Sequence, residues 1–365
     1  IPKLLADNSY PAGGTAFEWT NWINGFLHLN QNISLISYEG IDENVKVNSK
    51  LKIIESYSPT KGIPKIRLFY YQIPKLYKAI KKAEAHFLFQ QNAGILSGVT
   101  SIICKYLRVP FVYRVGSDID VLKDVYKKLG CIKYYFFQIS LLNADYIICQ
   151  NDFQIKKIKQ RFPQKKILKL YNPFIIKKHT KFDVRKIRTH ISWIGNFRAV
   201  KNLDLLLQIA ESLPNLKFKI AGKKLSKTYD EKLDSTINKL KSLENVDFLG
   251  HLPKQEIFNL LNSSILLLNT SLYEGFSNTY IESLYMGCPI VCSKKSDPDN
   301  IIRDNNFGII VNKNSNYKNA ILKIKKEFNH IEFYKKSTKF VKSNFDYVMQ
   351  TKKLIKFLTH NDIRK

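Results

Sequence analysis

The sequence has few cysteines, no histidine spacing typical of a metal site and no long apolar run. Its cysteines include no Cys-x-x-Cys pair and lie mostly in apolar stretches, at Cys104, Cys131, Cys149, Cys288 and Cys292. An odd number of scattered cysteines is typical of buried, reduced thiols. No apolar stretch approaches the ~18 residues of a membrane helix, and the first residues contain no signal-peptide core. We therefore expect a cytoplasmic protein without a metal cofactor.

Acidic residues are also scarce, because 59 Lys and Arg stand against 30 Asp and Glu, a net charge of +29. Such a charge favours anionic partners, which include nucleotide diphosphates, anionic membranes and nucleic acid. Lys, Asn, Ile and Tyr are abundant together, so compositional bias of an AT-rich gene is an alternative explanation. A non-catalytic nucleic-acid binder would need aromatic side chains exposed along a basic groove. Here the aromatics mostly follow strand or helix-face patterns, which favours a core and argues against nucleic acid.

The chain is too long for one ordinary core, and 44% of its 365 residues are hydrophobic. Short apolar runs alternate with amphipathic stretches along both halves, which predicts an α/β fold with two doubly wound, parallel, Rossmann-like sheets. Asn172-Pro173 interrupts the alternation between the halves. We predict an N-terminal domain over 1–173 and a second domain over 174–345.

The stretch Ile265 to Cys292 combines four local signals. Ile265–Leu268 is a short apolar run that predicts a buried strand, and Ile290–Cys292 predicts the next one. Between them, Thr279 to Glu282 has the pattern of a capping box that would begin a helix, and Gly287 stands where a helix stop is expected. The stretch therefore predicts a strand, a loop, a helix and a strand.

Ligands of open α/β sheets lie beyond the carboxyl ends of the strands, so the loop 269–278 is the expected binding segment. The amide groups at the start of the following helix attract phosphate. Glu274 and Glu282 flank this anion site. Because carboxylates repel phosphate, these two acids more reasonably accept hydrogen bonds from hydroxyl groups. An anion site beside hydroxyl acceptors indicates a sugar nucleotide.

The run Glu274-Gly275-Phe276-Ser277-Asn278-Thr279, followed by Glu282, resembles the Glu-x7-Glu motif of retaining GT-B glycosyltransferases of family 4, the glycosyl transferases group 1. The resemblance implies that Glu274 contacts the transferred sugar, that the amides of residues 275–279 hold the diphosphate and that Glu282 binds the ribose. It also implies two domains facing across a cleft, with a last helix over 346–365 crossing back to the first domain.

The same resemblance implies the partners. The donor would be a nucleoside-diphosphate hexose, and the acceptor a carbohydrate or a lipid-linked molecule, in the assembly of a surface polysaccharide or glycolipid. It also implies a cytoplasmic protein that can contact the inner face of the plasma membrane, and no metal requirement.

Arg198 and Lys201 lie in the loop 195–202, between a predicted strand at His190–Ile194 and a predicted helix at Leu203–Leu213. Cations at a strand's carboxyl end can clamp a diphosphate. The loop resembles the family's Gly-Arg-…-Lys donor loop, in which Lys201 matches the lysine. Asn196 occupies the position of the arginine, and Arg198, two residues along, is our candidate substitute. The alternative is a pair of solvated surface cations.

Two segments of the first half are candidates for the same cleft. Gly13 and Gly14 follow an expected strand at 4–7 and resemble the family's Gly-Gly loop near the donor, although a plain tight turn is the more common explanation of a double glycine by itself. Asp118 follows the predicted strand Phe111–Val115 and is our candidate for binding an acceptor hydroxyl. Many relatives have a histidine near this position, which the present chain lacks.

Two further alternatives remain open. Asp118-x-Asp120 and Asp297-x-Asp299 both have the Asp-x-Asp pattern of metal-dependent GT-A transferases. Separately, the predicted helix 123–142 combines lysines with the aromatic run Tyr134–Phe137. This pattern is compatible with an anionic membrane surface and also with an ordinary core.

Overall fold

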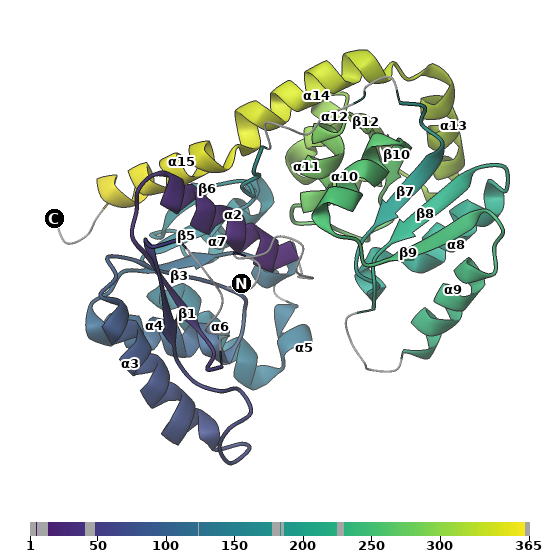
Figure 1. The fold of residues 1–365 in the computed structure, drawn as a ribbon. Helices are drawn as coiled ribbons and strands as arrows, with labels where there is room; N and C mark the ends of the chain where they lie inside the picture. Colours follow the sequence, from purple (N-terminus) through teal and green to yellow (C-terminus); the bar gives the residue numbers. More distant parts are fainter. Residues whose placement is uncertain are drawn as a thin grey trace. The chain divides into compact units, whose positions relative to one another are not determined.

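The chain folds into two compact α/β units. A computed structural model describes residues 5, 14–40, 48–122, 124–176, 183, 186–224 and 230–361. Unit 1 comprises residues 1–175 and 347–365, and unit 2 comprises residues 176–346 (Figure 1). The sequence had placed the domain boundaries after residues 173 and 345.

Unit 1 contains two parallel sheets in its described part. A two-stranded sheet joins β1 and β2, and a four-stranded sheet has the order β3-β4-β5-β6. The strands are β1 (Ile33–Ser37), β2 (Leu51–Glu55), β3 (Leu88–Gln91), β4 (Phe111–Arg114), β5 (Tyr146–Cys149) and β6 (Lys166–Lys169). The helices are α2 (Gly14–His28), α3 (Ile73–Ala83), α4 (Ile95–Leu107), α5 (Val125–Leu129), α6 (Cys131–Asn143), α7 (Asp152–Arg161) and α15 (Tyr347–His360).

The last helix, α15, belongs to unit 1 by its packing. Leu354 and Leu358 join the buried cluster around Trp22 of α2. The two helices approach closely at Gly25, where an added Cβ would lie 2.1 Å from Oγ1 of Thr351. A glycine at this point lets the backbones come together.

A buried ion pair lies beneath α2 in the same unit. Glu18 accepts a hydrogen bond from Nε of Arg114, and both side chains are almost fully buried. Nη2 of Arg114 also donates to Oδ1 of Asn172 at 2.8 Å. Buried charges are stable only when they are paired and hydrogen-bonded, and this pair satisfies both conditions.

Unit 2 contains one six-stranded parallel sheet in the order β12-β11-β10-β7-β8-β9. The strands are β7 (His190–Ile194), β8 (Lys217–Ala221), β9 (Val246–Gly250), β10 (Ser264–Leu268), β11 (Ile290–Ser293) and β12 (Gly308–Val311). The helices are α8 (Leu203–Ser212), α9 (Glu231–Lys241), α10 (Lys254–Asn262), α11 (Asn278–Tyr285), α12 (Ile301–Asp304), α13 (Tyr317–Glu327) and α14 (His330–Phe345). Read across the sheet from β9 to β12, the strands are the third, second, first, fourth, fifth and sixth of this unit in sequence. This is the strand order of a Rossmann sheet, and its switch point lies between β7 and β10.

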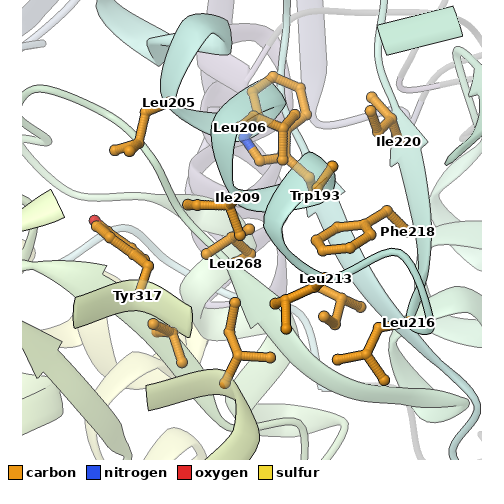
Figure 2. Close-up of a cluster of buried hydrophobic side chains, with 14 of the residues drawn as sticks. Trp193, Leu205, Leu206, Ile209, Leu213, Leu216, Phe218, Ile220, Leu268 and Tyr317 are labelled. Atoms are coloured by element: carbon orange, nitrogen blue, oxygen red, sulfur yellow. The ribbon is translucent and has the colours of Figure 1, made fainter. Parts of the chain in front are cut away.

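The core of unit 2 lies between this sheet and the helices that cover it. Figure 2 shows Trp193 of β7, Leu206 of α8, Phe218 of β8 and Leu268 of β10 within one cluster. All four side chains are buried. The predicted α/β class with parallel sheets is therefore confirmed.

The structure corrects two local predictions and decides between the two alternatives for the aromatic run Tyr134–Phe137. Of the expected strand at 4–7, only Leu5 is described, and it is helical. The predicted helix 123–142 is interrupted at Gly130, whose φ of +76° is in the left-handed region, so α5 and α6 are separate. The aromatic run in α6 belongs mainly to the core, because Phe137 is buried and Tyr134 and Phe136 pack against buried clusters. In addition, none of the described helices has the length and hydrophobicity needed to cross a membrane.

Candidate active site

Two loops meet at the switch point of unit 2. The first, residues 195–202, follows β7, and the second, residues 269–277, follows β10, the strand beside β7. They are hydrogen-bonded to each other, since Leu272 N–H donates to the carbonyl of Val200 at 2.9 Å and Thr270 Oγ1 donates to the carbonyl of Lys201 at 2.7 Å. Cations from the first loop and acids from the second are therefore held in a fixed relation.

Lys201 and Glu274 form an ion pair at the meeting point of these loops. Nζ of Lys201 donates to Oε1 of Glu274. The same oxygen accepts from Oγ of Ser271 at 2.7 Å and from Nδ2 of Asn269 at 3.2 Å. The side chains are 21% and 13% exposed, so they are accessible but largely shielded from solvent. Among the described residues, Oε2 of Glu274 accepts no hydrogen bond, which leaves it available to a hydroxyl group.

Local backbone geometry positions Lys201. Residues Ala199–Lys201 form a 3-10 turn, and Asn202 takes the left-handed conformation with a φ of +49°. Asparagine tolerates this conformation better than most residues. Its Oδ1 also caps α8 by accepting from Leu205 N–H at 3.4 Å. The short turn therefore ends at Lys201 and directs the chain into α8.

Glu282 lies within α11 and pairs with Lys254, the first residue of α10. This arrangement corrects the predicted capping box. The N-cap of α11 is Ser277, two residues earlier than Thr279, and Glu282 does not reach back to an amide at the start of the helix. Oγ of Ser277 and Oγ1 of Thr279 instead lie 2.7 Å apart. The carboxylate of Glu282 is therefore committed to a side-chain partner, and the first turn of α11 carries no acid.

α11 begins where the second loop ends, and the dipole of the helix favours an anion at its start. Gly275 and Phe276 precede it, and the ring of Phe276 packs on the ring of Phe345 with centroids 5.3 Å apart. Ser277, Asn278 and Thr279 then provide the first residues of the helix. Phe276 thus anchors the loop by its side chain.

Arg198 is on the Lys201 loop but outside the ion pair. Its carbonyl accepts from Lys201 N–H at 2.9 Å, while its side chain is exposed. Among the described residues, its guanidinium makes no hydrogen bond or ion pair. The structure therefore brings together Lys201, Glu274 and the start of α11, and it leaves Arg198 at the edge of this group.

The candidates of the first half lie in unit 1. Gly13 falls outside the described residues, and Gly14 is the first residue of α2. Asp118 begins a 3-10 turn, and its Oδ1 accepts from Nδ2 of Asn151 and Nε2 of Gln154, each at 2.9 Å. The amides of Asn151 and Gln154 therefore orient this carboxylate.

The Asp-x-Asp alternative is not supported by the environment of Asp297. Its two oxygens accept from the N–H groups of Ile302 and Arg303 at 2.8 and 3.1 Å, so it caps the short helix α12. Burial raises the pKa of Asp297. Across the part of the chain that the structure describes, no three His, Cys, Asp or Glu side chains are grouped closely enough to hold a metal ion.

Sequence reasoning missed Lys254, Ser271 and Asn269. Nothing in the sequence around Lys254 indicates a partner 28 residues away. Ser271 and Asn269 lie inside the loop that was singled out. Their polarity was a usable signal, because polar residues between a buried strand and a motif acid can orient that acid.

Comparison with known proteins gives a family match for unit 2. Residues 175–343 match the family model "Glycosyl transferases group 1". The match covers less than half of the chain, so it is a likeness of unit 2 to that family. The chain is also 22% identical, over 319 residues, to an uncharacterized glycosyltransferase of Methanocaldococcus jannaschii, with 86% of this chain and 85% of that protein covered.

Solved structures extend the likeness to both units of the fold. Sucrose-phosphate synthase from Thermosynechococcus elongatus matches with a TM-score of 0.76 at 14% identity, covering 99% of this chain and 98% of that one. HepE from Anabaena, in complex with UDP and glucose, matches with a TM-score of 0.73 at 14% identity, covering 96% and 97%. At such identities the likeness concerns the fold, which is GT-B, and this excludes the GT-A alternative. Together with the group 1 match over residues 175–343, it supports glycosyl transfer over a non-catalytic nucleic-acid binder.

Proposed function

We propose that the chain transfers a hexose from a nucleoside-diphosphate sugar to an acceptor hydroxyl, with retention of the anomeric configuration. The observation that carries this proposal is the pairing of Lys201 with Glu274 at the switch point of unit 2, beside the start of α11. A cation, a carboxylate with one unoccupied oxygen and a helix N-terminus match the phosphate and hydroxyl groups of a sugar nucleotide.

Lys201 and the start of α11 would stabilise the leaving group. Breaking the anomeric C–O bond develops negative charge on the diphosphate, and preorganised cations and amides lower the energy of that charge. Nζ of Lys201 carries three protons, so it can keep its bond to Glu274 while donating another to a phosphate oxygen. Arg198, exposed on the same loop, would add a second cation when a donor is bound.

The two glutamates would bind the sugars of the donor. Oε2 of Glu274 would accept a bond from a hexose hydroxyl, and its charge would balance the developing oxocarbenium ion. Glu282 would accept from the ribose hydroxyls, and the ammonium group of Lys254 pairs with this buried acid. Gly275 to Thr279 would hold the diphosphate through their backbone. We further propose that the leaving phosphate deprotonates the acceptor, so that neither a separate base nor a metal is required.

Gly13, Gly14 and Asp118 remain candidates of unit 1 for contacts near the donor and with the acceptor. The acceptor proposed is a carbohydrate or a lipid-linked molecule, and a role in surface polysaccharide or glycolipid assembly remains a prediction from the resemblance. A UDP-hexose is the first donor to test, because the structurally similar HepE binds UDP and glucose.

The test is a thermal-shift screen of UDP-, GDP- and ADP-hexoses, followed by assignment of the product anomer by NMR. A donor at 100 times its dissociation constant should stabilise the protein by about 2.7 kcal/mol. Glu274→Gln should bind the nucleotide and lose turnover, whereas Glu211→Gln on the exposed side of α8 should match the parent. Stabilisation by none of the donors, or an inverted product, would overturn the proposal. Activity abolished by EDTA and restored by Mn²⁺ would overturn its metal-free mechanism.

A further inference from the structure

Unit 1 carries a segment with an unusual combination of charge and exposed apolar residues. Residues 58–83 include seven lysines and arginines and no acidic residue. They run from the end of β2 through a single π-helical turn (Leu68–Gln72) into α3 (Figure 1). The domain assignment and the proposed glycosyl transfer leave this segment without a role.

Four large apolar side chains of the segment face water. Ile63 is 62% exposed and Phe69 66%, and Ile66 and Tyr70 are each more than half exposed. Isolated exposed apolar residues are ordinary, but a group of them within eight residues indicates a surface that another body covers. Aliphatic side chains cannot stack on nucleic-acid bases, so Ile63 and Ile66 argue against that partner.

Hydrogen bonds fix the backbone of this segment, so the exposure of its apolar side chains does not result from a loose loop. Ile63 N–H donates to the hydroxyl of Tyr70 at 2.6 Å, and Nη1 of Arg67 donates to the carbonyl of Thr60 at 3.1 Å. Arg67 N–H also donates to the carbonyl of Ile63 at 2.9 Å. The hydrogen bonds fix the turn, and the apolar side chains remain outside it.

A basic pocket adjoins the segment. Its volume is about 570 Å³, and its charged lining consists of Lys61, Lys75, Lys78, Lys82, Glu39 and Glu55. Glu39 is already neutralised, because it accepts from Lys75 and from the hydroxyl of Tyr71 at 3.1 Å, and Lys61 lies 3.4 Å away. Lys78 and Lys82, one turn apart on α3, form no ion pair with the residues that the structure describes. The pocket is therefore net positive and suited to an oxyanion.

We propose that residues 58–82 dock the protein on an anionic lipid bilayer. Ile63, Ile66 and Phe69 enter the interface between headgroups and acyl chains, and Lys78 and Lys82 in the pocket bind headgroup phosphates. Apolar side chains within a cluster of cations are the pattern of an interfacial membrane anchor. A protein partner of opposite charge is the competing occupant, and the experiment below separates the two. The proposal is independent of the identity of the sugar donor.

This surface differs from the one that the sequence indicated. The predicted helix 123–142 has most of its aromatic run in the core, and only Tyr135 of that run is exposed. The sequence of residues 65–82 is rich in basic and aromatic residues and is compatible with an ordinary helix. Only the structure shows that its first turns leave large apolar groups in water.

Binding to vesicles tests the proposal. The parent protein is floated with vesicles of phosphatidylcholine alone or mixed with phosphatidylglycerol, and we expect binding only to the anionic mixture. Lys78→Glu with Lys82→Glu should weaken binding at least about tenfold. The matched control, Lys325→Glu with Lys326→Glu on exposed positions of α13, has the same change in net charge and should bind close to the parent level.

Two apolar variants complete the experiment. Ile66→Ser with Phe69→Ser should also lose binding, whereas Ile187→Ser, at another exposed apolar position, should not. Phe69→Trp should show a blue shift of its emission with anionic vesicles. Equal losses in the charge variant and its control would mean that total charge alone drives binding, and would overturn the assignment. Failure of the parent protein to bind anionic vesicles would overturn the assignment as well. Release of the bound protein by inorganic phosphate, at the concentration expected for a soluble ligand, would also overturn it.

Failure of this inference is distinguishable from failure of the proposed function. The variants at Ile66, Phe69, Lys78 and Lys82 should keep the thermal shift with the nucleotide sugar, because these residues belong to unit 1. A protein without donor binding could still float with vesicles, and a functional transferase could fail to do so.

Discussion

Lys201 and Glu274 form an ion pair in unit 2, although 73 residues separate them in the chain. Their loops follow the adjacent strands β7 and β10, and two further hydrogen bonds connect these loops. The fold thus places a cation for a phosphate beside an acid for a sugar at the switch point of a Rossmann sheet. This relation underlies the first prediction.

Lys201→Ala should reduce turnover by about 10²- to 10³-fold, the loss that follows removal of one preorganised donor to a developing anion. Initial rates at saturating donor measure the effect. Lys217→Ala is the control, because Lys217 is exposed at the opposite, amino end of the neighbouring strand β8. A Lys201→Ala enzyme within a few-fold of the parent would show that Lys201 only holds Glu274 in place.

Glu282→Gln should raise the KM for the donor about tenfold with a smaller effect on kcat, because the ribose is remote from the breaking bond. Donor titrations measure the change in KM.

Lys254→Met should lower the free energy of unfolding by about 1–3 kcal/mol, since it leaves the buried Glu282 carboxylate without its partner. The double variant should recover part of that loss. Urea unfolding measures the change in stability. Lys241→Met on the exposed face of α9 is the control. Additive losses in the double variant would refute the coupling.

How much of the structure could be predicted from the sequence depends on which signals act between residues that are close together in the chain. The strand Ser264–Leu268 and the helix stop at Gly287 were predictable, because apolar runs and a left-handed glycine act within a few residues. The capping box was wrong, because Thr279-x-x-Glu282 fits a cap and a helix interior equally well, and Ser277 precedes both. Lys254 could not be assigned to Glu282, since only the packing of α10 and α11 brings them together.

Gly25→Ala should destabilise unit 1, although alanine is the better helix former. An added Cβ would lie 2.1 Å from Oγ1 of Thr351 and 3.0 Å from the carbonyl of Tyr347, so α2 and α15 would have to separate. The expected loss is about 1–3 kcal/mol, measured by urea unfolding. Combining it with Thr351→Ala should restore part of the stability, and Thr351→Ala alone reports the cost of the lost hydroxyl. Earlier proteolytic cleavage of α15 should accompany the destabilisation, and an unchanged midpoint would contradict the close packing.

Acid should destabilise the protein through two histidines in unit 2, the buried His190 and the half-buried His330. Burial lowers the pKa of His190 and of His330 from 6.5 to about 4. Between these values the unfolded chain binds more protons than the folded one, so the free energy of unfolding falls as the pH falls from about 6.5 to about 4. The fall is complete below the folded pKa and amounts to about 3 kcal/mol for a fully shifted group.

Urea unfolding across this pH range measures the effect. His190→Gln should flatten the dependence, because glutamine does not titrate, and His190→Gln with His330→Gln should flatten it further. His86→Gln, at an exposed position of unit 1, should leave the slope unchanged. Buried carboxylates make the same contribution to the pH dependence of stability in all variants. The difference in slope between variants therefore measures the contribution of the histidines. An identical slope in the double variant and the parent would show that neither ring remains neutral in the folded protein at about pH 5.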